Sequence, residues 1–295
     1  MKLKDINIRD PFILKDEKSH SYYLYSNNGS HPEFGKGFCT YVSKDLKDWS
    51  DPIVVFKPNK DFWGTNDFWA PEVYCYKNEY YLIATFSSEN HKRGCQILKA
   101  SSPLGPFEVY SEIVTPEDNN CLDGTLYFKD NKVYLIYCHE WIELDIGTVE
   151  VVELSSDLRR RISDPVLLFK GTDAKWVGTD LWFAPNRKVC ITDGVFVFED
   201  GENKALLWSS YVNDKDYGTG VAYPTDFTKP TYKQSEKILD IFDAGHSMVL
   251  NTFENENYLV LHVNNKNHGK ERAELHRIWF ENGEVKVDKN PAELN

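Results

Sequence analysis

Apolar and aromatic residues alternate with polar ones in short, paired runs along the whole chain. In the run at residues 73–76 and its partner at 80–83, the polar residues 77–79 form the connection. The same pattern recurs at residues 124–128 with 133–137 and at residues 195–198 with 205–208. Alternation with a period of two around a polar turn is typical of β-hairpins. We therefore expect an all-β chain in which helix is scarce, apart from a turn or two in loops such as residues 61–68.

Five of these hairpins begin with an ionisable residue, namely Asp10, Glu72, Asp123, Asp193 and His246. They lie roughly fifty to seventy residues apart, a spacing expected of propeller blades and too long for most solenoid repeats. All units but the fifth continue into a run that ends in a Ser/Thr-Asp or Ser-Pro turn, at residues 43–49, 101–107, 155–158 and 225–228. Four strands in each of five units predict a five-bladed β-propeller. No linker-like stretch divides the chain, so we expect one domain over residues 1–295.

The innermost strand of every propeller blade runs beside the central channel, so residues at equivalent positions of different blades converge. We therefore expect Asp10, Asp123 and Asp193 to share a pocket, with Glu72 and His246 nearby. Crowding and burial of like charges raise the pKa of some carboxyls, which leaves one protonated and another ionised. That division is what hydrolysis of a glycosidic bond requires.

The segments around these five residues resemble glycoside hydrolase family 43 over nearly the whole chain. The similar motifs lie at residues 9–13, 68–73, 122–128, 191–196 and 245–248. The resemblance implies a five-bladed propeller that hydrolyses arabinose- or xylose-containing glycans with inversion and needs no organic cofactor. It implies that Asp10 is the general base and that Asp123 tunes and orients the general acid. Asp193 stands where the family has that acid.

The motif of the fourth blade departs from the family pattern. The family usually has Glu followed by Gly and Pro, whereas this chain has Asp193, Gly194 and Val195. An aspartate is one methylene shorter, so its carboxyl falls about 1.5 Å short unless the backbone moves inward. Three alternatives follow: Asp193 still serves as the acid, Glu140 reaches in as an alternative acid, or catalysis is lost.

Aromatic residues near the five motifs are candidates for a sugar-binding platform, because sugar rings present apolar C–H faces to indole rings. We expect Trp69, Trp141 and Trp182 to fill this role. Packing between blades is the alternative for Trp141 and Trp182. Trp208 and Trp279 fall in or just after strand runs and are expected in the core.

The two remaining channel residues allow more than one interpretation. Glu72 is expected either to bind a sugar hydroxyl or to pair with Arg9 across the channel. His246 is expected in a binding, bracing or structural role. Relatives of the resembled family often hold a calcium ion beside this histidine, so the resemblance also implies a possible structural calcium in the channel, with His246 as the metal-associated residue.

Charge and composition exclude several other classes of function. The formal net charge is −12 and the pI is near 5.2, whereas nucleic-acid binding needs clustered Lys and Arg. No apolar stretch is long enough to span a membrane, and the first residues contain no apolar signal region. We expect a cytoplasmic protein, unless a signal was trimmed from the sequence. The six cysteines form no C-x-x-C pair and are expected to be buried thiols rather than zinc ligands.

The favoured function is an inverting α-L-arabinofuranosidase that acts on arabinose-containing glycans or oligosaccharides. A β-xylosidase or an endo-arabinanase of the same family remains an alternative. An alternative of another class is a non-catalytic carbohydrate-binding propeller that has lost its acid. The sequence leaves the oligomeric state open.

Overall fold

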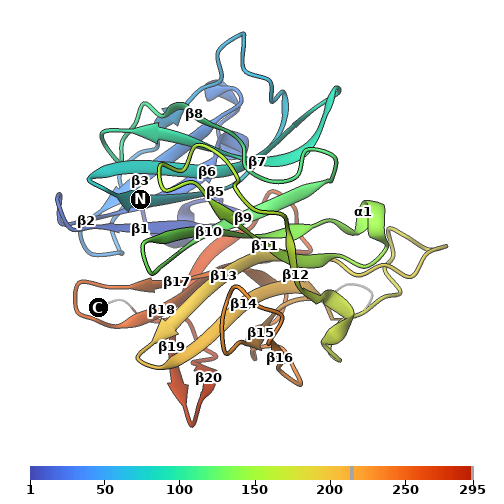
Figure 1. Ribbon diagram of the computed structural model, residues 1–295. Coiled ribbons are helices and arrows are strands. Elements are labelled where there is room, and N and C mark those ends of the chain that lie inside the picture. The colour runs from blue at the N-terminus through green and yellow to red at the C-terminus, as the bar shows by residue number, and fades with distance from the viewer. Residues whose placement is uncertain (213–215, 294–295) are drawn as a thin grey trace.

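Five four-stranded antiparallel sheets follow one another along the chain and form a five-bladed β-propeller (Figure 1). The computed structural model describes residues 1–212 and 216–293. Within each sheet the strands pair in chain order. The fold predicted from the repeats is therefore confirmed. That the whole range 1–295 is a single domain stays a prediction, and residues 213–215 and 294–295 lie outside the described part.

The strands of the five blades have the following bounds. The first blade contains β1 (Phe12–Asp16), β2 (Ser21–Asn27), β3 (Phe38–Ser43) and β4 (Ile53–Phe56), and the second β5 (Asn66–Tyr76), β6 (Glu79–Ser88), β7 (His91–Ala100) and β8 (Glu108–Ile113). The third contains β9 (Cys121–Lys129), β10 (Lys132–His139), β11 (Thr148–Leu154) and β12 (Val166–Lys170). The fourth contains β13 (Asp193–Asp200), β14 (Asn203–Tyr211), β15 (Tyr217–Tyr223) and β16 (Lys233–Gln234), and the fifth β17 (Ala244–Asn251), β18 (Asn257–Val263), β19 (Arg272–Glu281) and β20 (Glu284–Val287).

Helix is scarce in the described residues, as predicted. It consists of the one-turn α1 (Trp141–Leu144) and the 3-10 turns η1 (Leu3–Asp5), η2 (Asn28–Ser30), η3 (Pro32–Phe34) and η4 (Gly171–Asp173). The prediction of a helical turn within residues 61–68 is wrong, because this loop runs directly into β5. Phe62 and Phe68 pack on Phe86 with ring centroids 5.0 and 5.2 Å apart, and the N–H of Thr65 donates to the carbonyl of Ser87 on β6 at 2.8 Å, so the segment is tied to the sheet. Among the described helices, none is long and apolar enough to cross a bilayer.

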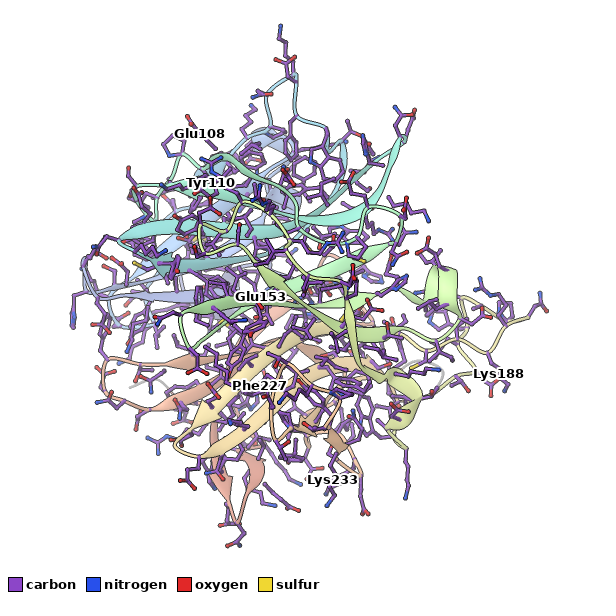
Figure 2. All side chains as sticks on the ribbon, viewed as in Figure 1. Glu108, Tyr110, Glu153, Lys188, Phe227 and Lys233 are labelled. Carbon is purple, nitrogen blue, oxygen red and sulfur yellow. The ribbon has the colours of Figure 1, made fainter. Side chains whose placement is uncertain are left out.

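Aromatic and aliphatic side chains fill the spaces between blades. Trp208 is fully buried, as predicted, and packs on Trp176 at 4.6 Å between ring centroids. Phe227 is likewise fully buried, whereas Lys233 lies on the outside of the molecule (Figure 2). The core prediction for Trp279 is wrong, because it lies opposite Lys286 on the outer pair β19 and β20 and is 39% exposed.

The first and fifth blades close the ring. Strand β1 lies beside β17, as Figure 1 shows for the blue and red ends of the chain. The backbone N–H of Ile13 contacts Met248 Sδ at 3.0 Å, and the N–H of Ile8 donates to the carbonyl of Glu271 at 3.1 Å. Five of the six cysteines are buried, while Cys75 is exposed and so differs from the prediction.

A left-handed residue recurs near the start of all five innermost strands. The φ values are 52° at Asp10, 45° at Ala70, 54° at Asp123, 53° at Gly194 and 50° at His246. The pairing with the second strand shifts at this point in β5, β9, β13 and β17, which is the signature of a β-bulge. Left-handed backbone at non-glycine residues is uncommon and clusters at functional sites.

These bulges correct the predicted equivalence of the five ionisable residues. Asp10, Asp123 and His246 occupy the left-handed position itself. In the fourth blade Gly194 takes that position, so Asp193 lies one residue earlier. Its glycine is required, because a Cβ there would lie 2.7 Å from the Cα of His246.

In the second blade Ala70 is the left-handed residue, so Glu72 lies two residues further along β5. The sequence alone did not reveal either offset.

Candidate active site

Asp10, Asp123 and His246 meet at the axis of the propeller. Nδ1 of His246 lies 3.2 Å from Asp10 Oδ1 and 3.7 Å from Asp123 Oδ2. The side chains of Asp10 and His246 are only 12% and 13% exposed, and that of Asp123 is 8% exposed. Residues 113 or more positions apart along the chain are thus neighbours in one small volume, as the repeat pattern predicted.

The surroundings of Asp10 favour its ionised form. Burial alone would raise its pKa, but the positive charges of His246 and Arg9 and the contact with His262 outweigh burial and hold the pKa below its usual range. Arg9 Nε lies 3.7 Å and His262 Nδ1 3.4 Å from Asp10 Oδ1. Asp10 is therefore a carboxylate that can accept a proton.

Arg9 and His262 are fixed by a shared framework from the fifth blade. Arg9 Nη1 donates to Asn265 Oδ1 at 2.8 Å and to Glu271 Oε1 at 3.4 Å. His262 Nε2 lies 3.3 Å from the same Asn265 Oδ1. The predicted pairing of Arg9 with Glu72 is wrong, because Asp10 and Glu271 are the carboxylates that the guanidinium reaches. His262 carried no motif, and only its position in an otherwise apolar strand run could have drawn attention to it.

Asp123 and Asp193 form a pair of carboxyls with raised pKa values. Burial raises the pKa of Asp123 to about 8, and the charge of Asp10 adds to this. Burial, then the charge of Asp123, raises the pKa of Asp193 to about 7. The N–H of Gly194 donates to Asp123 Oδ2 at 2.9 Å, and the Tyr217 hydroxyl donates to Asp193 Oδ2 at 3.0 Å. Close carboxyls titrate together, so this pair retains a proton near neutral pH while Asp10 does not.

Glu72 is a buried carboxyl deeper in the channel. It accepts a hydrogen bond from the Tyr74 hydroxyl, which also lies 2.8 Å from Thr125 Oγ1. Burial raises the pKa of Glu72 to about 8, so it is largely neutral at physiological pH. That Glu72 binds a sugar hydroxyl stays a prediction.

The channel beside Asp10 contains a small cavity. Its size and its lining can be compared with what a calcium ion needs. The cavity measures about 10 Å³ and is lined by Asp10, Glu72, His246 and Ser247 among others. That is roughly the space of one water molecule, whereas calcium takes about six to eight oxygen ligands. Among the described residues, no group of three or more His, Cys, Asp or Glu side chains is arranged to hold a metal. These side chains do not fit a calcium ion held by protein oxygens.

Glu140 lies at the end of the third blade's second strand and is buried against the second blade. Arg93 Nη1 donates to Glu140 Oε2 at 2.6 Å, and Arg93 Nε donates to Asp67 Oδ2 at 2.8 Å. The guanidinium also covers the ring of Trp69 at 4.6 Å from its centroid. Burial raises the pKa of Glu140, while Arg93 lowers it. No sequence motif pointed to Arg93, which joins Trp69, Asp67 and Glu140 into one cluster.

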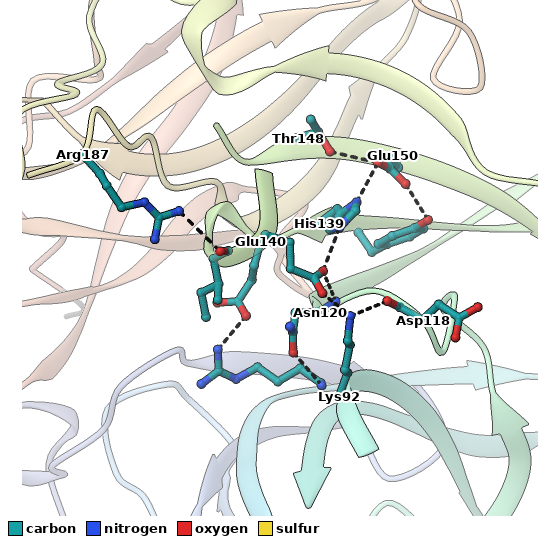
Figure 3. A network of polar contacts seen from close by, with 12 residues as sticks. Lys92, Asp118, Asn120, His139, Glu140, Thr148, Glu150 and Arg187 are labelled. Carbon is teal, nitrogen blue, oxygen red and sulfur yellow. Dashed lines mark hydrogen bonds and ion pairs between the residues drawn. The ribbon is translucent and has the colours of Figure 1, made fainter. Parts of the chain in front are cut away.

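A network centred on His139 holds the backbone next to Glu140 (Figure 3). His139 lies 3.2 Å from both Glu150 Oε1 and Glu143 Oε2. Glu143 accepts from the N–H of Asn120 at 2.7 Å, and the carbonyl of Asn120 accepts from the N–H of Glu140 at 2.8 Å. Burial alone would lower the pKa of His139, but its bonds to the two glutamates raise it. The network therefore fixes the position of Glu140 from behind.

The three candidate tryptophans lie in different settings. Trp69 stands between two irregularities in the pairing of β5 and contacts Arg93. Trp141 and Trp182 both pack on Phe183, at 5.4 and 5.5 Å between ring centroids. Trp182 is 58% exposed, so it does not serve packing between blades. Sugar binding by these three residues stays a prediction.

Comparisons with solved structures place the chain among glycan-degrading propellers. It is 35% identical to an endo-arabinase from Bacteroides thetaiotaomicron, with a TM-score of 0.89 over 96% of this chain and 98% of that chain. A thermostable family-43 glycoside hydrolase is 24% identical, with a TM-score of 0.81 over 97% and 95%. An α-L-arabinofuranosidase from Lactobacillus brevis is 16% identical, with a TM-score of 0.77 over 100% and 99%.

The search of curated proteins gave no match. The model of glycosyl hydrolases family 43 matches residues 5–281, nearly the whole chain. An ionised Asp10 near a carboxyl pair that retains a proton, in this fold, is the arrangement that inverting hydrolysis of a glycosidic bond needs. The chain belongs to glycosyl hydrolase family 43 and is a glycoside hydrolase.

Proposed function

We propose that this enzyme hydrolyses α-L-arabinofuranosidic bonds of arabinan-type glycans with inversion of configuration. The observation that carries the proposal is an ionised Asp10 near two carboxyls of raised pKa, Asp123 and Asp193, in a chain 35% identical to an endo-arabinase. The xylanase and arabinofuranosidase neighbours are 20% and 16% identical and support the fold alone. The prediction of exo-acting arabinofuranosidase activity and the alternative of β-xylosidase activity remain untested.

Asp10 is the general base in this proposal. Its carboxylate takes a proton from a water molecule, whose oxygen then attacks the anomeric carbon of the bound sugar. Arg9 and His262 keep the carboxylate ionised and oriented through their own bonds to Asn265. Because attack and departure occur on opposite faces, the configuration inverts.

Asp193 is the general acid. It gives its proton to the glycosidic oxygen as the bond between that oxygen and the anomeric carbon breaks. Burial and the charge of Asp123 raise its pKa, which keeps the proton available near neutral pH. Asp123 also fixes the start of β13 by accepting from the N–H of Gly194 at 2.9 Å. Each turnover thus moves one proton to Asp10 and one from Asp193, and exchange with water restores both.

A substrate screen tests this proposal. We expect the enzyme to release sugar from an aryl α-L-arabinofuranoside and from linear arabinan, and to release less from an aryl β-D-xyloside, as followed by absorbance and reducing-end assays. A preference for the xyloside would contradict the substrate class. No release from any of the three would favour the non-catalytic sugar-binding alternative.

The pH profile of kcat/KM should be bell-shaped, with a broad acidic side. Activity requires Asp10 without its proton, and its pKa lies below the usual range, so we expect the acidic limb below about pH 4. Activity also requires Asp193 with its proton, so activity should fall as pH rises through about 7. The two carboxyls titrate as a pair, and the charge that Asp123 carries once it is ionised raises the pKa of Asp193. Replacing Asp123 by Asn removes this charge, so the basic limb should move to lower pH. If the basic limb of Asp123→Asn stays at the same pH as in the wild type, Asp123 does not contribute to the pKa of Asp193.

A further inference from the structure

A surface hollow lies between the first and second blades, beside the catalytic centre. It measures about 650 Å³, within the range of roughly 300–1,000 Å³ usual for ligand sites. Its lining comes from the end of β2 with the following loop and from the start of β5, and includes Asn28, Lys36, Gly37, Asn66, Asp67 and Trp69. It is termed here the first-blade hollow.

The first-blade hollow adjoins the reacting groups through two consecutive residues. Trp69 lines the hollow, and the next residue, Ala70, lines the small channel cavity together with Asp10 and His246. Consecutive Cα atoms are about 3.8 Å apart, so little separates the two spaces. The proposed acid, Asp193, belongs to the fourth blade, across the ring from this hollow. The hollow therefore lies on the side of the base, away from the departing group.

The polar groups of the hollow suit a neutral, hydroxyl-rich ligand. Asn28 is 4% exposed, and its Oδ1 has no hydrogen-bond partner within the part of the chain that the structure describes. Its Nδ2 is held by the carbonyl of Gly35 at 3.1 Å. The carboxylate at the rim is already paired, since Asp67 accepts from Arg93 at 2.8 Å, and the Lys36 ammonium is held by the carbonyl of Thr65. An amide oxygen without a partner beside an indole ring is a typical setting for a sugar.

The hollow is formed by the fold itself. Gly37 has φ of 140°, and a Cβ there would lie 2.1 Å from the carbonyl oxygen of Phe56 and 3.2 Å from Asn28 Nδ2. The loop can therefore approach the fourth strand and Asn28 only because this residue is glycine.

We propose that the first-blade hollow binds the arabinosyl residues that precede the cleaved bond on the non-reducing side. This inference rests on the proposed function and adds to it, because a chain that continues into the hollow is not cleaved directly after its terminal non-reducing residue. It predicts that products longer than arabinose dominate during hydrolysis of arabinan.

Binding to an inactive variant tests the hollow separately from catalysis. In the Asp10→Asn background, we expect α-1,5-linked arabinohexaose to bind at least tenfold more tightly than arabinobiose by calorimetry. Adding Asn66→Trp, or Lys36→Trp as a second exposed position, should occlude the hollow and abolish this tenfold difference. The matched control Asn290→Trp changes an asparagine in a hollow of about 850 Å³ that is lined by Tyr22, at the opposite end of β2 from Asn27. It should leave hexaose binding unchanged.

Equal binding of hexaose and biose, or unchanged hexaose binding in both tryptophan variants, would overturn the inference. Hydrolysis of arabinan by the wild-type enzyme is measured in parallel. If hydrolysis occurs while the variants bind hexaose normally, the proposed function stands and the hollow is excluded. If hydrolysis is absent while Asn66→Trp still blocks hexaose binding, the hollow stands as a sugar site and the proposed function fails.

Discussion

Replacing Asp10 by Asn should lower kcat/KM on arabino-oligosaccharides by about 10³- to 10⁴-fold, near the upper range for loss of a general base. The amide has nearly the same shape but cannot take a proton from water. Asn also tolerates left-handed backbone, so the φ of 52° at this position should persist. Loss of rate with an unchanged unfolding temperature is therefore the expected result, measured by initial rates and thermal unfolding.

A second Asp-Pro pair provides the control for Asp10. Asp51 precedes Pro52 in an exposed segment before β4, so Asp51→Asn changes the same dipeptide away from the channel. We expect wild-type rates from that variant. Retention of more than about a tenth of the activity by Asp10→Asn would remove Asp10 from the role of base, since a general base contributes at least about 10²-fold.

The fold was predictable because its signals are local. Each hairpin carries its own alternation and turn, and residues 73–83 illustrate both within eleven positions. Each hairpin alone is a weak signal, but five similar hairpins at blade spacing together predict one architecture. Convergence of Asp10, Asp123 and His246 followed from the same repetition, since equal positions in equal blades must meet at the axis.

The parts of the site that escaped prediction are not repeated. Arg93 lies on the third strand of its blade and His262 on the second, and both act through contacts with residues far away in sequence, such as Glu140 and Asp10. The one-residue offset of Asp193 depends on which residue adopts φ near 50°. The sequence pattern around Gly194 does not indicate that this glycine is the left-handed residue. Non-local contacts and backbone bulges therefore limit what sequence patterns reveal.

The offset of Asp193 bears on whether this residue can replace the longer glutamate of the family. Asp193 does not stand at the bulge but pairs with Ser209 just before it. Its partner, Tyr217, lies on the third strand of the same blade and orients the carboxyl from behind. Glu140 is the competitor, since burial also raises its pKa and the charge of Glu140 acts on Asp123.

The immediate contacts of the two carboxyls favour different protonation states. Glu140 accepts a charge-assisted bond from Arg93 at 2.6 Å, which stabilises its anion. Asp193 accepts from a neutral hydroxyl at 3.0 Å, and the charge of Asp123 raises its pKa further. Glu140 is therefore better suited to holding Arg93 and Trp69 in place than to giving up a proton.

Paired substitutions should separate the two carboxyls. Asp193→Asn should lose about 10²- to 10⁴-fold in kcat on arabino-oligosaccharides, whose departing oxygen needs a proton, and much less on a dinitrophenyl arabinofuranoside, whose departing oxygen does not. The basic limb of its pH profile near 7 should disappear on the activated substrate. Glu140→Gln should instead raise KM and keep both the basic limb and the ratio between the two substrates.

If the effects of the two substitutions are exchanged, Glu140 is the general acid that gives its proton to the departing oxygen. In that case Glu140→Gln would lose rate selectively on the unactivated substrate, and Arg93 would have to release its carboxylate before each turnover. Arg93→Lys then provides a further test, because lysine keeps the charge but cannot bridge Asp67 and Glu140 with a planar fork. If Glu140 only positions the substrate, Arg93→Lys should change KM with little effect on the pH profile. If Glu140 is the acid, the same substitution should move the basic limb.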